Sequence, residues 1–282
     1  MSIASERVEM DEDEVAFTKA RELTDEEKVK LTQQDTRLVS SFKANKLEID
    51  SKKNWDLFYK RNDTRFFKNR HWTTREFEEL LDDKSEQSTP KKMLEIGCGV
   101  GNLIYPLIED KLNRYFIYAC DLSERAVDLV KSNSLYDENI MKAFQCDITK
   151  NDIFQYLEND SVDIVTAVFV LSAIHPDKFS TTLQNIFNIL KPGGVLLFRD
   201  YGLYDMAQLR FKPGNKIADN FYVRQDGTRS FYFSTEYLES LLRSAGFHII
   251  SNTYIHRRTV NIKSNIDVPR IFVQGKYMKP YS

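Results

Sequence analysis

A buried strand that runs directly into a glycine-rich turn is the feature that most constrains the fold of this chain. Residues 93–101 read MLEIGCGVG, and a helical segment follows at once. Glycine lets the backbone turn sharply and lets a ligand approach where a Cβ would block it. A dinucleotide fingerprint needs its third glycine three residues after the second, and Asn102 holds that place. The GxGxG spacing, with Glu95 ahead of it, suits a ligand without a pyrophosphate, although a bare structural bend can carry the same glycines.

Short apolar runs alternate with helical patterns after this point, which predicts an α/β domain over residues 89–282. We expect strands at 92–97, 115–120, 141–146, 162–169 and 194–200, and helices near 101–110, 123–133, 177–190 and 235–245. Two late strands, at 247–256 and 268–278, have no helix between them and should form an antiparallel hairpin at one edge. The result is a mostly parallel sheet of seven strands with helices on both faces, interrupted by an insertion at 201–233.

Carboxylates close the second and third of these strands. Asp121 follows the glycine loop by about 20 residues, where a carboxylate can accept hydrogen bonds from both hydroxyls of a ribose. Asp147 is placed to accept from an adenine amino group, and Ile148 beside it could cover the ring. Either Asp could instead cap a helix or stabilise a turn. Because ligands of open α/β sheets lie at the carboxyl ends of the strands, the set favours an adenosine-containing ligand at this edge.

The N-terminal part has a different character. Residues 1–22 are acidic without periodicity and should form a disordered tail. Thr24 and Glu27 have capping-box spacing, which should start a helix that runs to about Asp50. Residues 43–75 hold ten Lys or Arg against four acids, in a chain whose formal net charge is −2. Aromatic residues are interleaved with these charges, a mixture that suits single-stranded nucleic acid. A charged helix face whose aromatic residues pack on the core would look the same.

Several classes of protein are excluded. The three cysteines, Cys98, Cys120 and Cys146, cannot all pair and lack the spacing of a zinc finger, so we expect neither disulfides nor a metal site. The apolar stretch at 164–174 is shorter than the ~18–20 residues that a membrane-spanning helix needs. The acidic N-terminus does not match a secretory or mitochondrial signal. We therefore expect no membrane association and a location in the cytosol, or also in the nucleus.

The glycine loop, Asp121 and the strand end at Asp147 resemble class I S-adenosylmethionine-dependent methyltransferases. Longer strings are similar, more narrowly, to the tRNA N(3)-methylcytidine methyltransferases. They are KNWDLFYKRN at 53–62, FKNRHW at 67–72, LSAIHP at 171–176, FRDYG at 198–202 and FYVRQDGTR at 221–229. The resemblance extends from about Leu38 to Lys279, and the short N-terminal extension is most similar to the members of the family that act on serine tRNAs.

This resemblance implies a class I Rossmann-like fold and methylation of the anticodon-loop cytidine at tRNA position 32, on its ring nitrogen 3. S-adenosyl-L-methionine is the implied cofactor, and seryl-tRNA synthetase is an implied partner. Residues 23–88 would then form a helical extension that covers the cofactor and contacts RNA. The cofactor contacts implied by the matching positions are Trp55, Tyr59, Gly97, Gly99, Asp121, Asp147, Ile148 and Val168.

The chemistry of this reaction makes few demands on catalytic residues. Ring nitrogen 3 of cytosine has a free lone pair at neutral pH, so the transfer needs alignment and electrostatics rather than a general base. The atom lies on the pairing edge, so the base must be unpaired or flipped out. We expect Asp200, just past the fifth strand, to hold the cytosine and balance the positive charge of the product. His175 is a second candidate, although a His before Pro could simply cap the next helix.

Other functions remain open at this stage. Lys and Arg residues at 199–230 and 257–279 could join residues 43–75 in one positive surface that binds phosphates, or they could be solvated surface charge. A methyltransferase for a protein or small molecule would share the cofactor pocket but would leave the basic aromatic segment unexplained. A non-catalytic adapter that binds S-adenosylmethionine and RNA is a third reading. The glycine spacing disfavours a nicotinamide-dependent dehydrogenase.

Overall fold

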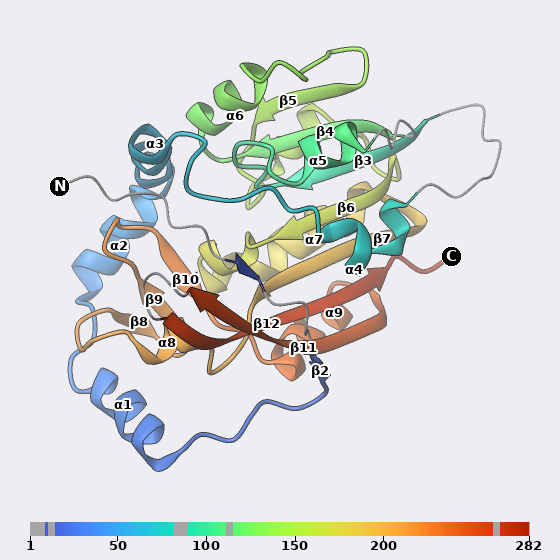
Figure 1. Cartoon of the computed structure of the whole chain (residues 1–282). Coiled ribbons are helices and arrows are strands. Elements are labelled where there is room, and N and C mark those ends of the chain that lie inside the picture. The colour runs from blue at the N-terminus through green and yellow to red at the C-terminus, as the bar shows by residue number, and fades with distance from the viewer. Residues whose placement is uncertain (1–8, 11–14, 82–89, 111–114, 262–265, 282) are drawn as a thin grey trace.

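A twisted sheet with helices on both faces organises the computed structural model, which describes residues 9–10, 15–81, 90–110, 115–261 and 266–281 (Figure 1). Five parallel strands form its centre: β3 (Lys91–Ile96), β4 (Tyr115–Asp121), β5 (Met141–Gln145), β6 (Val162–Val168) and β7 (Leu190–Tyr201). The long strands β11 (His248–Asn261) and β12 (Ile266–Met278) form an antiparallel hairpin, with β12 against β7. The predicted seven strands and the hairpin are confirmed.

The order of these strands is β11-β12-β7-β6-β3-β4-β5. The chain starts in the middle of the sheet at β3, moves outward to β5, and returns to β6 on the other side of β3. The connections from β3 and from β6 therefore leave in opposite directions at their carboxyl ends. Such a reversal opens a crevice for a ligand at that edge of an α/β sheet.

Alternating side chains of the strands supply a separate core on each face of the sheet. On one face, Leu94 of β3 packs with α7 (Phe179–Ile189) and α9 (Thr235–Ser244). On the other face, Met93 packs with α5 (Ile104–Glu109) and α6 (Glu124–Lys131). Both residues are fully buried, as expected for a parallel sheet covered on both sides.

The N-terminal tail was expected to lack structure, and the residues described there correct this. Two short strands, β1 (Glu9–Met10) and β2 (Val15–Phe17), pair with β11 and extend the sheet to nine strands. The hairpin is therefore not the outermost element of the sheet. These strands could not be predicted from the acidic composition. A strand that pairs with an existing sheet edge is held by backbone hydrogen bonds and needs no apolar pattern.

The single helix predicted from Thr24 to about Asp50 is wrong in length. The capping box at Thr24 is present, but α1 (Asp25–Asp35) ends early and is followed by α2 (Ser41–Ile49) and α3 (Ser51–Asn62). Ser40 caps α2 by accepting a hydrogen bond from the backbone N–H of Lys43. An N-cap Ser has extended backbone angles and so interrupts a continuous helix. The short helix α4 (Thr73–Glu76) completes the extension.

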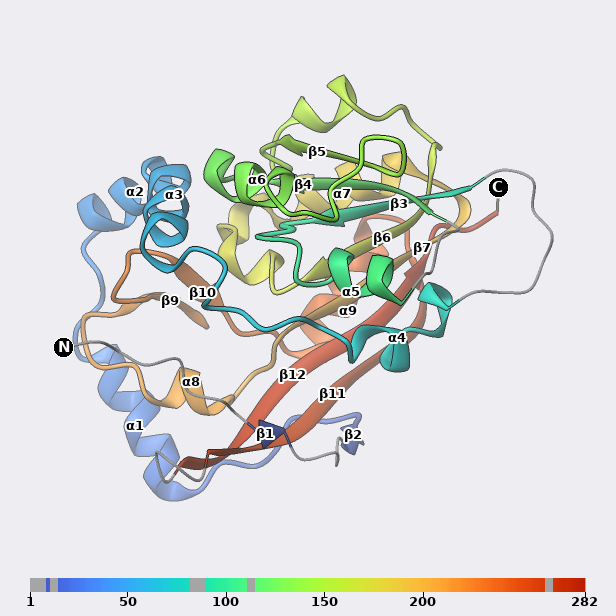
Figure 2. The same cartoon turned by 45° about the horizontal axis from the view of Figure 1, so that its top comes forward.

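The insertion after β7 forms a small platform of its own. It contains α8 (Met206–Leu209) and a three-stranded sheet of β8 (Lys216–Ala218), β9 (Phe221–Val223) and β10 (Arg229–Phe231). The buried Gln34 of α1 joins the two parts, since its amide donates to the carbonyl of Gln208 and accepts from the hydroxyl of Tyr222. Figures 1 and 2 show α1, α2 and α3 beside this platform.

Within the part of the chain that the structure describes, no helix has the length and apolarity to cross a membrane. The described residues also contain no cluster of three His, Cys, Asp or Glu side chains that could hold a metal ion.

Candidate active site

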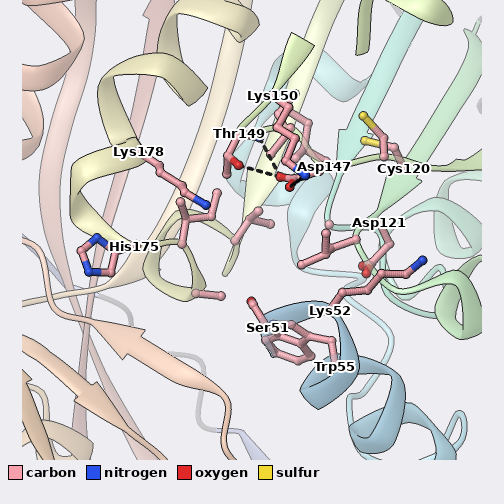
Figure 3. A pocket seen from close by; sticks show the side chains of 18 of the residues that line it. Ser51, Lys52, Trp55, Cys120, Asp121, Asp147, Thr149, Lys150, His175 and Lys178 are labelled. Carbon is pink, nitrogen blue, oxygen red and sulfur yellow. Dashed lines mark hydrogen bonds and ion pairs between the residues drawn. The ribbon is translucent and has the colours of Figure 1, made fainter. Parts of the chain in front are cut away.

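A cavity of about 620 Å³ opens at the carboxyl ends of the parallel strands. Residues from β3, β4, β5 and the turn after β6 line it, and α2, α3 and β10 close it from the extension and the insertion. Figure 3 shows two sides: Asp121, Asp147 and Lys150 lie on one, and His175 and Lys178 on the other. The location agrees with the prediction from the strand ends.

The glycine loop and Asp121 are held together by backbone hydrogen bonds. The N–H of Gly99 donates to one oxygen of the Asp121 carboxylate at 2.9 Å, and the N–H of Ser123 donates to the other at 2.8 Å. Burial raises the pKa of Asp121 to about 6, against the lowering effect of these hydrogen bonds. Each oxygen keeps a second lone pair, so the fixed carboxylate can still accept from a ligand's hydroxyl groups.

Asp147 stabilises its own turn and also faces the cavity. One carboxylate oxygen accepts from the N–H and the hydroxyl of Thr149, at 3.1 and 2.7 Å. The ammonium of Lys150 lies 3.2 Å from the other oxygen. Ile148, between them, lines the cavity with an apolar side chain. Both earlier readings of Asp147, as a turn residue and as a ligand-facing carboxylate, therefore apply (Figure 3).

Helix α3 covers the glycine loop. Tyr59 is buried, and its hydroxyl oxygen lies 2.9 Å from where a Cβ on Gly99 would be, which explains why glycine is needed there. The hydroxyl of Ser123 donates to Asp56 of α3 at 2.6 Å. Trp55, one turn before Tyr59, lines the cavity (Figure 3). The extension therefore forms a wall of the cavity, as the resemblance implied.

The aromatic residues of segment 43–75 were expected either to contact nucleic acid or to pack on the core, and they divide into buried and exposed ones. Phe58 and Tyr59 are buried against Val100 and Ala126, which is core packing. Phe66, by contrast, is 58% exposed. Only the exposed part of the segment is therefore available to a partner.

A buried ion pair that sequence reasoning missed lies behind the glycine loop. Arg70, from the extension, has its guanidinium 3.9 Å from the carboxylate of Glu95 in β3 and donates to the carbonyl of Val168 at 3.2 Å. Burial nevertheless raises the pKa of Glu95 to about 8, since Arg70 compensates only in part. The second oxygen of Glu95 is buried without a hydrogen bond in the described structure. The sequence signals were Glu95 ahead of the glycine loop and the position of Arg70 inside FKNRHW.

Two of the predicted cofactor contacts, Val168 and Gly99, do not line the main cavity. Val168 is buried and packs in the core on the α5–α6 face; Phe169 and Val170, which follow it, line the cavity instead. Phe169 has a positive φ of 61°, so the chain turns at the end of β6 and the lining shifts by one residue. Gly99 lines a smaller adjoining cavity of about 40 Å³ rather than the main one.

The two predicted catalytic residues differ in their positions. Asp200 has no exposed surface, and its oxygens accept from the backbone N–H groups of Ser172 and Tyr201 at 2.9 and 2.8 Å. It anchors the turn after β6, and its contact with the base stays a prediction. His175 does line the cavity, but its Nδ1 accepts from the N–H of Asp177 at 3.3 Å, which is the capping alternative.

Three charged side chains from distant parts of the chain meet on the side of the cavity away from Asp121. Glu48 of α2 forms ion pairs with Lys178 and with Arg229 of β10, and all three line the cavity. The Arg229 guanidinium also donates to the hydroxyl of Ser51 and the carbonyl of Ala173, each at 3.3 Å. Sequence reasoning grouped Arg229 with the surface cations and did not single out Glu48.

The residues of the Asp121 side fit S-adenosylmethionine. Two carboxylates at successive strand ends suit the hydroxyls of a ribose and the amino group of an adenine, and Ile148 and Trp55 offer apolar surface to a flat ring. The glycine loop keeps the backbone free of a Cβ where the cofactor would approach.

Comparisons with known proteins agree with this site. A family model described as a methyltransferase domain matches residues 67–252. The structure is similar to those of a putative S-adenosylmethionine-dependent methyltransferase from Listeria monocytogenes (TM-score 0.54, 18% identity, 75% of this chain and 98% of that one) and another from Anabaena variabilis (TM-score 0.55, 12% identity, 80% and 94%). These two show the fold, and S-adenosylmethionine is the cofactor of this class of enzymes.

Curated relatives are much more similar in sequence. The tRNA N(3)-cytidine methyltransferase METTL6 of Homo sapiens is 55% identical over 93% of this chain and 91% of its own length. The tRNA N(3)-methylcytidine methyltransferase trm141 of Schizosaccharomyces pombe is 44% identical over 86% of this chain and 97% of its own. The METTL2 enzyme of Xenopus tropicalis is 39% identical over 80% of this chain and 77% of its own. The chain thus belongs to the tRNA N(3)-cytidine methyltransferases, a family of enzymes that use S-adenosylmethionine.

Proposed function

We propose that this protein transfers the methyl group of S-adenosylmethionine to ring nitrogen 3 of a cytidine in tRNA, at position 32 of the anticodon loop of serine tRNAs. The observation that carries the proposal is the two-sided cavity. Its Asp121 side suits a nucleoside cofactor. Its other side presents His175 and Lys178 to a second ligand, together with Glu48 and Arg229, which form ion pairs with each other and, through Glu48, with Lys178. The names of the relatives support tRNA cytidine as that ligand.

The cavity supports this transfer without a general base. When bound, S-adenosylmethionine supplies a sulfonium methyl group that a lone pair can attack. Asp121 and Asp147 hold the nucleoside part in a fixed place, and α3 excludes water above it. Since the attacking nitrogen carries no proton at neutral pH, the protein only needs to align the base and stabilise the positive charge that the base acquires.

A basic groove beside the cavity supports RNA as the substrate. Lys52, Lys53 and Lys60 of α3 and Arg125 of α6 line this groove, together with Asp56. Ile49 and Lys52 line both the groove and the cavity. Asp56 is occupied by the hydroxyl of Ser123. Phosphates bound along these cations would therefore lead a flipped-out base to the cavity mouth.

Serine tRNA and seryl-tRNA synthetase, as substrate and partner, rest on the resemblance of the short extension to one branch of the family. We propose that the synthetase presents the tRNA to this protein. This proposal is tested with the complex of the two proteins.

The test is methyl transfer from labelled S-adenosylmethionine to total tRNA, with and without seryl-tRNA synthetase, followed by nucleoside mass spectrometry. We expect 3-methylcytidine, at position 32 of serine tRNAs, and more of it when the synthetase is present. Asp121→Asn serves as the control that removes cofactor binding. Labelled protein, or a methylated small molecule in place of 3-methylcytidine, would contradict the proposal.

A further inference from the structure

Glu48 is the cavity carboxylate that the cofactor side does not use. The other carboxylates that line the cavity among the described residues, Asp121, Asp147 and Asp152, follow β4 and β5. Glu48 comes instead from α2 and pairs with Lys178 and Arg229. Figure 3 shows Lys178 on the side of His175. Glu48 is therefore placed to contact the second ligand of the cavity and not the cofactor.

The neighbours of Glu48 keep it ionised and fixed. Burial alone would raise its pKa, but hydrogen bonds from Lys178 and Arg229 outweigh this and lower the pKa below the ordinary value. The Glu48 side chain is still 26% exposed, so it is accessible from the cavity. A carboxylate has about four acceptor sites, and its two cations leave some of these free.

Arg229 fixes the Glu48 carboxylate from one side. Its side chain is only 4% exposed, and Glu48, Ser51 and Ala173 hold it in place. The guanidinium also lies over the ring of Phe221, 5.5 Å from the ring centre. Because a guanidinium is planar and rigid, these contacts leave Arg229 and its Glu48 partner little freedom to move.

A fixed carboxylate can distinguish cytosine from uracil. The pairing edge of cytosine carries an amino donor at position 4 and a carbonyl acceptor at position 2, with the reacting nitrogen between them. Uracil has a carbonyl oxygen at position 4, which a carboxylate would repel. The amino group has two hydrogens, so a carboxylate that accepts from the one pointing away from ring nitrogen 3 leaves that nitrogen free to react.

We propose that Glu48, held in place by Arg229, accepts a hydrogen bond from the 4-amino group of the target cytosine, so that Glu48 selects cytosine over uracil. This inference rests on the proposed function and names the residue that reads the base. Glu48 is accessible from the cavity, whereas Asp200 has no exposed surface.

The test compares two substrates across variants at Glu48. One is serine tRNA with its natural cytidine, and the other carries at that position the analogue that lacks the 4-amino group but keeps ring nitrogen 3. Wild type, Glu48→Gln and Glu48→Met are assayed for kcat/KM on both, with seryl-tRNA synthetase present. The two bases differ in intrinsic reactivity, but that difference is common to all variants, so a change in the ratio reports contact with the amino group.

We expect the preference of the wild type for cytidine to fall by about 10-fold or more in Glu48→Met, since a hydrogen bond to a charged group has roughly this strength. Glu48→Gln should be intermediate, because its carbonyl still accepts. Glu27→Gln is the matched control: Glu27 also pairs with an arginine in the extension, Arg21, but it does not line the cavity, and its substrate ratio should equal that of the wild type.

Two results would overturn the inference. If Glu48→Met slows both substrates equally, Glu48 only fastens α2 to β10 and does not read the base. Calorimetric titration with S-adenosylhomocysteine shows whether such a loss comes from a displaced cofactor site. If the wild type methylates no cytidine at all, the proposed function fails and this inference fails with it.

Discussion

The two sides of the cavity are built in different ways. On the cofactor side, Asp121 and Asp147 lie at the ends of parallel strands, and their partners belong to that edge of the sheet, as with Asp121 and the N–H of Gly99 or Asp147 and Thr149. On the other side, Glu48 and Arg229 are separated by 181 residues and meet through side-chain ion pairs. The cofactor side follows from the arrangement of the strand ends. The other side forms only when the extension and the insertion pack against each other.

This difference separates binding from selection. A site made of strand ends binds the cofactor that all methyltransferases of this fold share. A wall made of added segments can change its ligand without changing the sheet, since loops and insertions carry specificity on a rigid scaffold. Damage to the cofactor side should abolish cofactor binding, and damage to the other side should alter substrate use while the cofactor still binds.

Removal of the carboxylate at Asp121 should have the largest effect. Asp121→Ala loses the hydrogen bonds to the ribose and the fixed position of the glycine loop, so we expect S-adenosylhomocysteine to bind at least about 100-fold more weakly, as the loss of two hydrogen bonds to a charged group predicts. Calorimetric titration measures this. Asp128→Asn, an exposed carboxylate on α6, is the control and should leave affinity unchanged. If Asp121→Ala binds S-adenosylhomocysteine as tightly as the wild type does, the cofactor does not bind at Asp121.

The contact between the glycine loop and the extension can be broken at Gly99. Its φ of +56° strains any other residue, and an added Cβ would lie 2.9 Å from the hydroxyl of Tyr59. Gly99→Ala should lower the free energy of unfolding by about 2 kcal/mol, measured by urea denaturation. The same substitution in a Tyr59→Phe background should be less damaging, because the clashing oxygen is gone. Identical losses in both backgrounds would show that α3 does not press on the loop.

The raised pKa of Glu95 should make the stability of the protein depend on pH. Its pKa is about 8 in the folded protein against an ordinary 4.5, so the folded state binds more protons and the protein loses stability as pH rises from about 4.5 to about 8. The loss reaches at most about 1.4 kcal/mol per pH unit for one proton. Glu95→Gln should remove it. Urea denaturation at pH 6.5 and 8 measures the difference, and parallel losses in the two proteins would contradict the account.

Substitution of a single groove lysine should have the smallest effect. Lys60→Gln removes one cation from the groove beside α3, so tRNA binding should weaken a few-fold. The slope of log Kd against log salt concentration should decrease by the amount that about one phosphate contact contributes. Fluorescence anisotropy at several salt concentrations measures both. Lys191→Gln, at the start of β7 and paired with Asp163, should change neither. Equal slopes for Lys60→Gln and the wild type would place the RNA elsewhere.

The same contrast explains what the sequence could predict. Strand order, the hairpin, the glycine loop, Asp121 and Asp147 follow from periodicity and from the rule that ligands lie at strand ends. The edge strands β1 and β2 could not be predicted, because their pairing with β11 uses backbone groups of distant residues. The backbone partners of Asp200 could not be predicted either, because proximity to a strand end does not show whether a carboxylate faces the cavity or its own backbone.

The ion pairs of Arg70 and Glu48 were missed for a related reason. Each joins the N-terminal extension to a residue of the methyltransferase domain, and no local pattern marks such a pair. Their positions became clear only when the folded extension placed α2, α3 and the segment after them against the strand ends.

The most direct test of the two-sided cavity is a crystal structure with S-adenosylhomocysteine and the anticodon stem-loop of a serine tRNA. The account predicts adenosine at Asp121, Asp147 and Ile148, and a flipped cytosine whose amino group contacts Glu48. A cytosine bound away from Glu48, or adenosine bound beside Arg229, would contradict it.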